Sequence, residues 1–238
     1  MRANPVMLSE KVIEAANKAI DSEERLIVKA YGFIPVTEFF MRDFIKKILT
    51  KFNRPELASA VSMLIKELTV NAAKANFKKL LFLENSIDVK NPADYERGMK
   101  LFREAITDTM PFEYGAKAKE ASLNVHTSFD FDAERIIIEV KNNLPMSPIE
   151  EQRVREKLRQ AMECEDIADF MMENVDETEG AGLGIILSLM ALKSSAIDPH
   201  ALTISTDFKN ETIARVEIPL TDSYKPQLRR AHDATVAS

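Results

Sequence analysis

The chain has 238 residues, of which 45% are hydrophobic and 29% are charged. These fractions match those of folded soluble proteins, so they exclude wholesale disorder and an integral membrane protein. The formal net charge of -6 works against binding to nucleic acid, because nucleic-acid phosphates need a basic surface. The length is sufficient for a full core, and we expect one sheet-containing domain.

The N-terminal residues carry a charge every few positions, so they hold no apolar stretch that would serve as a signal peptide or span a bilayer. We therefore expect a cytoplasmic protein. Cys164 is the only cysteine, which excludes an internal disulfide and a cysteine-based zinc site. His126, His200 and His232 lie too far apart for a local metal motif.

The first elements in chain order are helical. Apolar spacing over residues 9–29 predicts a helix that passes into a short extended segment, and residues 1–34 are interpreted as an N-terminal arm. That helix is also a candidate dimer element. Residues 37–51 are predicted to form an amphipathic helix, with these residues on one side: Phe40, Phe44, Ile45 and Leu49.

A third helix is predicted to begin at Asn53. Glu56 follows three residues later as in a capping box, and Pro55 lies in the first turn, where proline is tolerated. We expect this helix to continue to Phe77 or beyond.

Residues 84–120 are polar, contain two prolines and are interpreted as an insertion with a helical stretch around residues 95–106. Alternating residues over 122–131 and 135–140 then predict a hairpin. A further helix is predicted to start at Ser147, with Pro148 at its first position and Glu150 completing a capping box.

A second hairpin is predicted near the C-terminus, with its turn at residues 209–211, and the polar tail over residues 221–238 is expected to fray. The order of helices, hairpin, helix, loop, helix and hairpin predicts an α+β fold. We expect a two-layer sandwich over residues 35–220, with a mixed, mostly antiparallel sheet and helices on one face.

A polar stripe runs along the third helix. Its apolar residues, Leu57, Val61, Leu64, Ile65, Leu68 and Ala72, centre on one side and are expected to face the core. Glu67, Asn71 and Lys74 follow at i, i+4 and i+7, roughly 100° from that centre, so they border the core. A carboxylate can orient or deprotonate a nucleophile, an amide oxygen can bind Mg²⁺, and an ammonium can neutralise phosphate. The alternative interpretation of the stripe is a solvated helix flank with charged residues and no binding function.

A glycine-rich turn holds three of the six glycines, Gly180, Gly182 and Gly184, directly before an apolar run that predicts a buried helix. Such a turn offers unpaired N–H groups and the positive end of a helix dipole to an anion, which favours phosphate binding. The turn fits neither the dinucleotide fingerprint nor the GxxxxGK loop. Close helix packing is the alternative reason for small residues here.

Three segments, taken in order, resemble the motifs of one ATPase superfamily. ELTVNAAK (67–74), VKNNLPMSP (140–148) and EGAGLGIILSLMALK (179–193) are similar to the N, G1 and G2 boxes shared by gyrase, histidine kinases, MutL and the ninety-kilodalton chaperone. The resemblance covers about residues 35–220 and implies the Bergerat-type sandwich that binds Mg-ATP.

The resemblance implies a role for each matching residue. Glu67 matches the general base, Asn71 the Mg²⁺ ligand and Lys74 a phosphate-side residue. Gly180, Gly182 and Gly184 match the hinge of the ATP lid and its triphosphate contacts.

The middle motif departs from the family pattern of Asp-x-Gly-x-Gly. Asn142 stands where the family has the aspartate that accepts a hydrogen bond from the adenine amino group, and Leu144 and Met146 replace both glycines. A neutral acceptor forms a weaker bond than a carboxylate does. The two larger side chains can also occupy room that the base would need.

The segment between Arg159 and Lys193 contains no basic residue. Acidic residues gather before the glycines at Glu163, Glu165, Asp166, Asp169, Glu173, Asp176, Glu177 and Glu179. This charge would repel a triphosphate unless Mg²⁺ intervenes or the acids point outward. Two interpretations of this acidic segment remain: a solvated acidic surface and a docking surface for a basic partner.

Three functions are consistent with the sequence. The first is a stand-alone histidine-kinase-like protein that binds Mg-ATP and either hydrolyses it slowly or phosphorylates a separate protein in signalling. The chain has no histidine before His126, so an upstream phosphoacceptor histidine is not expected. The second is a catalytically inactive relative that regulates a protein partner by docking. The third is a structural α/β protein in which the motifs are coincidental.

Overall fold

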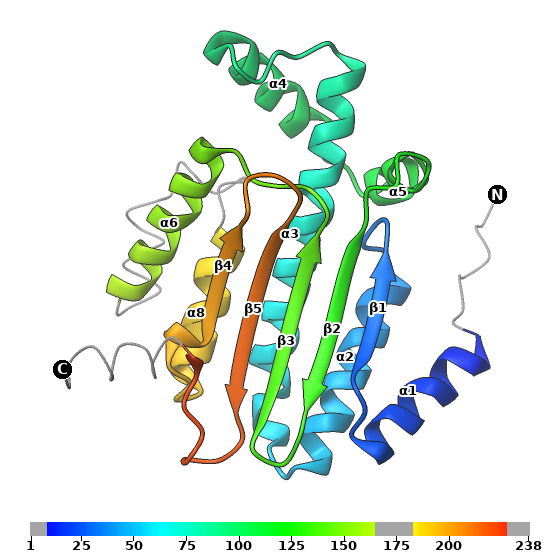
Figure 1. Cartoon of the computed structure of the whole chain (residues 1–238), viewed down its shortest axis with the longest axis vertical. Coiled ribbons are helices and arrows are strands. Elements are labelled where there is room, and N and C mark those ends of the chain that lie inside the picture. Colours follow the sequence, from blue (N-terminus) through cyan, green and yellow to red (C-terminus); the bar gives the residue numbers. More distant parts are fainter. Residues whose placement is uncertain (1–8, 165–182, 228–238) are drawn as a thin grey trace.

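A computed structural model describes residues 9–164 and 183–227 (Figure 1). The elements in chain order are α1 (Glu10–Ser22), β1 (Leu26–Ala30), α2 (Pro35–Lys51), η1 (Pro55–Leu57), α3 (Ala58–Glu84), α4 (Pro92–Ala105), α5 (Met110–Glu120), β2 (Val125–Phe131), β3 (Arg135–Asn142), α6 (Pro148–Glu163), α8 (Leu183–Ser194), η3 (Pro199–Ala201), β4 (Leu202–Thr206) and β5 (Thr212–Pro219).

The five strands form one open sheet in the order β1-β2-β3-β5-β4 (Figure 1). Every neighbouring pair is antiparallel, for example Phe129 opposite Ile138 and Ile138 opposite Val216. Both predicted hairpins are present, as β2–β3 and β4–β5. The expected sheet is therefore confirmed, and all of its described strand pairs are antiparallel.

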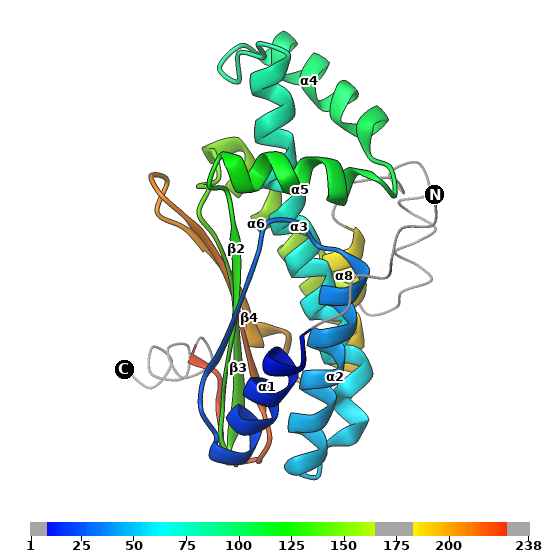
Figure 2. The ribbon, with the colours of Figure 1, turned by 90° about the vertical axis from the view of Figure 1, so that its right-hand side faces the viewer.

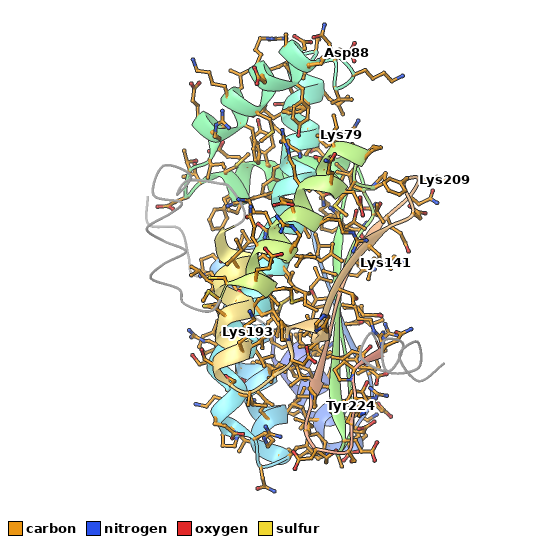
Figure 3. The ribbon with its side chains drawn as sticks, turned by 90° about the vertical axis from the view of Figure 1, so that its left-hand side faces the viewer. Lys79, Asp88, Lys141, Lys193, Lys209 and Tyr224 are labelled. Carbon is orange, nitrogen blue, oxygen red and sulfur yellow. The ribbon has the colours of Figure 1, made fainter. Side chains whose placement is uncertain are left out.

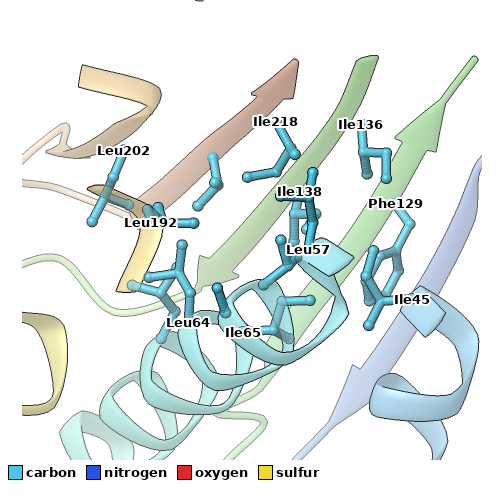
Figure 4. Packing of buried hydrophobic residues seen from close by; sticks show 14 of the residues in the cluster. Ile45, Leu57, Leu64, Ile65, Phe129, Ile136, Ile138, Leu192, Leu202 and Ile218 are labelled. Carbon is cyan, nitrogen blue, oxygen red and sulfur yellow. The ribbon is translucent and has the colours of Figure 1, made fainter. Parts of the chain in front are cut away.

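Helices α2, α3 and α8 cover one face of the sheet, which confirms the two-layer α+β sandwich (Figure 2). Alternate residues of β3 face these helices, and the apolar stripe of α3 faces the strands. Leu64 is completely buried between the layers, together with Ile138 and Leu192 (Figure 4). Burial of such side chains is the main source of stability, since it removes apolar surface from water.

The segment expected as an N-terminal arm contributes a strand to the sheet. Helix α1 ends at Ser22, and β1 then pairs along β2, with Ile27 opposite Ser128. β1 is thus an edge strand of the main sheet.

The predicted start of the third helix at Asn53 is wrong. Asn53 follows the end of α2 and has a φ of 58°, a left-handed conformation that asparagine tolerates better than most residues. The predicted capping partner Glu56 instead pairs with Arg54, whose Nε lies 2.7 Å from Glu56 Oε1. The chain passes through η1, and α3 begins at Ala58 without a side-chain cap. Its continuation beyond Phe77 is confirmed.

The insertion forms two helices, α4 and α5, which pack against the C-terminal part of α3 around a second apolar cluster. The sequence indicated α4 but not α5. Pro111 lies in the first turn of α5, where the missing N–H has no intrahelical partner to lose.

The start of α6 is as predicted. The Ser147 side chain accepts from the Glu150 backbone, and the Glu150 side chain accepts from the Ser147 backbone, which completes the capping box. At the C-terminus, residues 221–227 approach the outer face of the sheet, where Tyr224 Oη donates to Glu217 Oε2 at 2.6 Å (Figure 3). Residues 228–238 of the expected tail lie outside the described part of the chain.

Candidate nucleotide site

One flank of α3 carries the predicted polar residues. Glu67, Asn71 and Lys74 are each partly buried, as expected for a stripe that borders the core. Lys78 continues the row, because eleven residues of helix rotate it to within roughly 20° of Glu67. We refer to Glu67, Asn71, Lys74 and Lys78 as the α3 flank. Within the described part of the chain, the side chains of Asn71 and Lys74 have no hydrogen-bond or ion-pair partner.

Glu67 contacts Gly184 at the first described turn of α8. A methyl group built on Gly184 would lie 1.9 Å from Glu67 Oε2 and 2.3 Å from Glu67 Cδ. No side chain can occupy that position while Glu67 stays where it is. α3 and α8 therefore pack closely at this point, and the first and third sequence motifs meet here. Gly180 and Gly182 lie outside the described residues.

Asn142, at the end of β3, is connected to α3 but is covered. Its Nδ2 donates to the Ala72 carbonyl oxygen at 3.1 Å, which also fixes the orientation of the amide, since a carbonyl can only accept. The residue is 3% exposed, and Oδ1 has no hydrogen-bond partner among the described residues. The predicted acceptor is thus unpaired, but it is enclosed between helix and sheet in this conformation.

The loop after Asn142 accommodates its two non-glycine residues without strain. Neither Leu144 nor Met146 has a positive φ. Thr212 Oγ1 donates to the Leu144 carbonyl at 2.9 Å, and Met146 N donates to Thr206 Oγ1 at 3.2 Å. Met146 also packs against the core. Larger side chains therefore fill the loop where the family pattern has glycines.

The N-terminus of α6 is joined to the α3 flank by an ion pair. Lys78 Nζ donates to Glu150 Oε1, while Glu150 Oε2 accepts from Ser147 N and Ser147 Oγ, both at 2.9 Å. Burial alone would raise the pKa of Glu150. The Lys78 ammonium and the hydrogen bonds from Lys78 and Ser147 outweigh burial and hold this pKa below its ordinary value.

The other end of α6 is joined to α8. Lys193 Nζ donates to the carbonyl oxygens of Ala161 and Met162 at 2.8 Å and of Cys164 at 3.0 Å (Figure 3). These are carbonyls at a helix C-terminus, which have no intrahelical donor and favour a cation. The acidic residues predicted to gather in the lid from Glu165 onward lie outside the described part of the chain.

Sequence reasoning missed two buried polar side chains near Asn142. Counting partners in residues 9–164 and 183–227, Asn76 is fully buried with both amide atoms unpaired, and Thr127 is 1% exposed with an unpaired hydroxyl. Asn76 lies one turn beyond Ala72 and roughly 140° from Asn71, so it belongs to the core side of α3. The sequence could have predicted the burial of Asn76, because this residue follows Leu68 and Ala72 at four-residue spacing in the buried stripe.

The described residues include no group of three or more histidine, cysteine, aspartate or glutamate side chains that could hold a metal ion alone. Mg²⁺ usually keeps several waters and takes only one or two protein oxygens together with phosphate oxygens. The Asn71 amide oxygen fits that mode, with the Glu67 carboxylate one turn away.

A cavity of about 640 Å³ lies away from this site, between α2 and α3. Its lining includes Phe39, Met63 and Lys66 and none of the α3 flank. It therefore gives no support to a preformed nucleotide pocket at the flank. No described helix is both long and apolar enough to cross a bilayer.

Comparison of the chain with known proteins finds similarity to an uncharacterized protein. No known family pattern matches the chain, and no solved structure matches it. An uncharacterized protein of Treponema pallidum (strain Nichols) is 30% identical over 208 residues, which is 87% of this chain. The chain spans 40% of the length of that relative.

Proposed function

We propose that this chain is a histidine-kinase-like protein that binds Mg-ATP and either hydrolyses it slowly or transfers its phosphoryl group to a separate protein. Its role would be regulatory, and the proposed location is the cytoplasm. The contact between Glu67 and Gly184 carries the proposal. It joins two motifs that are distant in the sequence and that the resemblance assigns to one catalytic site.

Three residues of the α3 flank have roles that their chemistry supports. Asn71 offers a neutral amide oxygen to Mg²⁺. A bound Mg²⁺ ion would neutralise negative charge on the phosphates. Lys74 lies about one turn away, has no partner among the residues that the structure describes, and would bind phosphate oxygens. Glu67 would accept a proton from the attacking water or hydroxyl group.

A regulatory module without catalysis is the second candidate, and particular observations favour it. Asn142 is neutral, covered and bonded to Ala72, and Met146 packs on the core. A protein that had lost base recognition would show these features and would act by binding a protein partner or a second copy of itself.

Steady-state release of phosphate from Mg-ATP separates the two candidates. The proposed function predicts slow turnover that falls by about 100-fold or more in Glu67→Ala, since a general base contributes about that factor. Binding of Mg-ATP should persist in this variant. Glu104→Ala, which removes an exposed carboxylate on α4, should leave turnover unchanged. Binding without turnover or phosphotransfer to any acceptor would favour the regulatory module.

A further inference from the structure

Lys78 is the member of the α3 flank that the proposed function does not use. It lies one turn beyond Lys74, about 6 Å along the helix, on the same side. The two lysines differ in their surroundings. Lys74 has no partner within the described residues, whereas Lys78 is paired with Glu150. Among the described residues, the flank thus presents one unpaired cation and one paired cation in a row.

The ion pair of Lys78 is only partly accessible. The side chains of Lys78 and Glu150 are 19% and 25% exposed. Glu150 has a second function at the same time, because its other carboxylate oxygen closes the capping box with Ser147. A single carboxylate therefore connects the nucleotide-side flank of α3 to the first turn of α6.

A polyphosphate bound along the flank would compete with Glu150. Phosphate oxygens and the Glu150 carboxylate are both anions that form charge-assisted hydrogen bonds with the same ammonium group. They also repel each other at short range. Lys78 has three N–H donors, so a phosphate oxygen can approach beside Glu150, and the repulsion between the two anions then favours release of the carboxylate.

We infer that Lys78 is a second phosphate-binding cation of the nucleotide site and that Glu150 occupies it in the nucleotide-free state. This inference rests on the proposed function. Binding of the triphosphate transfers Lys78 from Glu150 to phosphate, and repulsion moves the carboxylate away. The capping box at Ser147 then opens, so nucleotide binding is coupled to the start of α6.

The test compares two α6 variants of the full chain by calorimetric titration with Mg-ATP. Glu150→Gln removes the competing charge and retains the capping box, because glutamine can occupy the same position. Glu151→Gln is the matched control, since Glu151 is also 25% exposed but pairs with Arg155. Glu150→Gln should bind Mg-ATP about threefold to tenfold more tightly than both Glu151→Gln and the unaltered chain.

Two further measurements address the role of Lys78 itself. Lys78→Met should weaken binding of Mg-ATP, and adding Glu150→Gln to it should give no gain in affinity. In the unaltered chain, hydrogen exchange at the Ser147 amide should accelerate on saturation with Mg-ATP, because that N–H donates to Glu150 Oε2. If Lys78→Met does not fold, the inference is still tested by hydrogen exchange at the Ser147 amide and by the comparison of Glu150→Gln with Glu151→Gln.

The outcomes separate this inference from the proposed function. If the unaltered chain binds Mg-ATP but Glu150→Gln binds no more tightly than Glu151→Gln, the inference is overturned and the proposed function stands. If neither the unaltered chain nor any variant binds Mg-ATP, both are overturned.

Discussion

The carboxylate of Glu67 lies directly against the Cα of Gly184, at a distance that leaves no room for a side chain on α8. Glu67 is on the flank of α3, and Gly184 is in the first described turn of α8. The Glu67 side chain can keep this position only because residue 184 is glycine. This contact gives Gly184 a packing role that holds whatever the site binds.

Gly184→Ala should destabilise the fold by about 0.5–1.5 kcal/mol, because the added methyl group overlaps the Glu67 carboxylate and displaces that side chain. Combining it with Glu67→Ala removes the overlap and should recover most of that loss. Urea unfolding of the single and double variants measures the coupling. Gly115→Ala is the control, since its methyl group would lie 3.7 Å from Gly32 in ordinary contact. Equal losses in the single and double variants would show that the contact does not limit packing.

Lys78→Met should lower the free energy of unfolding at neutral pH by about 1–3 kcal/mol, because it leaves the partly buried Glu150 carboxylate without its cation. The folded-state pKa of Glu150 lies below the ordinary value of 4.5. The contribution of the ion pair is therefore present above pH 4.5 and is lost as the pH falls through the folded pKa.

Urea titrations over a series of pH values test whether stability falls on acidification, as the lowered pKa of Glu150 predicts. The unaltered chain should lose stability on acidification below pH 4.5 more steeply than Glu150→Gln, which keeps the cap but has no ionisable group. Identical pH dependence in the two proteins would contradict a stabilising ion pair at Glu150.

Lys193→Met should also destabilise the fold by about 1–3 kcal/mol, since three carbonyl oxygens at the end of α6 lose their cationic donor. Amide exchange in the last turn of α6 should rise in this variant. Lys209→Met, in the exposed turn between β4 and β5, is the control and should change neither quantity. Unaltered exchange in α6 would show that Lys193 does not hold this end.

Asn142→Asp restores the residue of the family pattern but should destabilise this fold by about 1–3 kcal/mol at neutral pH. The carboxylate cannot donate to the Ala72 carbonyl and would be buried close to it. A thermal melt with and without Mg-ATP measures both stability and the gain on binding. Unchanged stability would mean that the bond between Asn142 and Ala72 contributes little.

The larger features of the fold follow from local patterns. Alternation identified the two hairpins, and apolar spacing identified α2 and α3, because these elements bury one regular face. A continuous apolar run identified α8. Helix α5 was missed, since its apolar residues fall at every second position instead of at helical spacing, and its packing partner is the distant end of α3. Asn53 was misread because a left-handed turn and a helix cap favour the same residue.

The candidate site was predictable only in part. Periodicity placed Glu67, Asn71 and Lys74 on one flank, and the structure agrees. The ion pair between Lys78 and Glu150 joins residues far apart in the chain, and no local pattern encodes such a contact. The covering of Asn142 likewise depends on how α3 packs on the sheet.

Calorimetric titration with Mg-ATP and Mg-ADP, using Asn71→Ala as the control, tests the central claim most directly. The proposed function predicts that the unaltered chain binds with a micromolar dissociation constant, which corresponds to a binding free energy on the order of 8 kcal/mol. It also predicts that Asn71→Ala loses this binding. No heat and no thermal stabilisation at millimolar nucleotide would contradict an ATP site on α3.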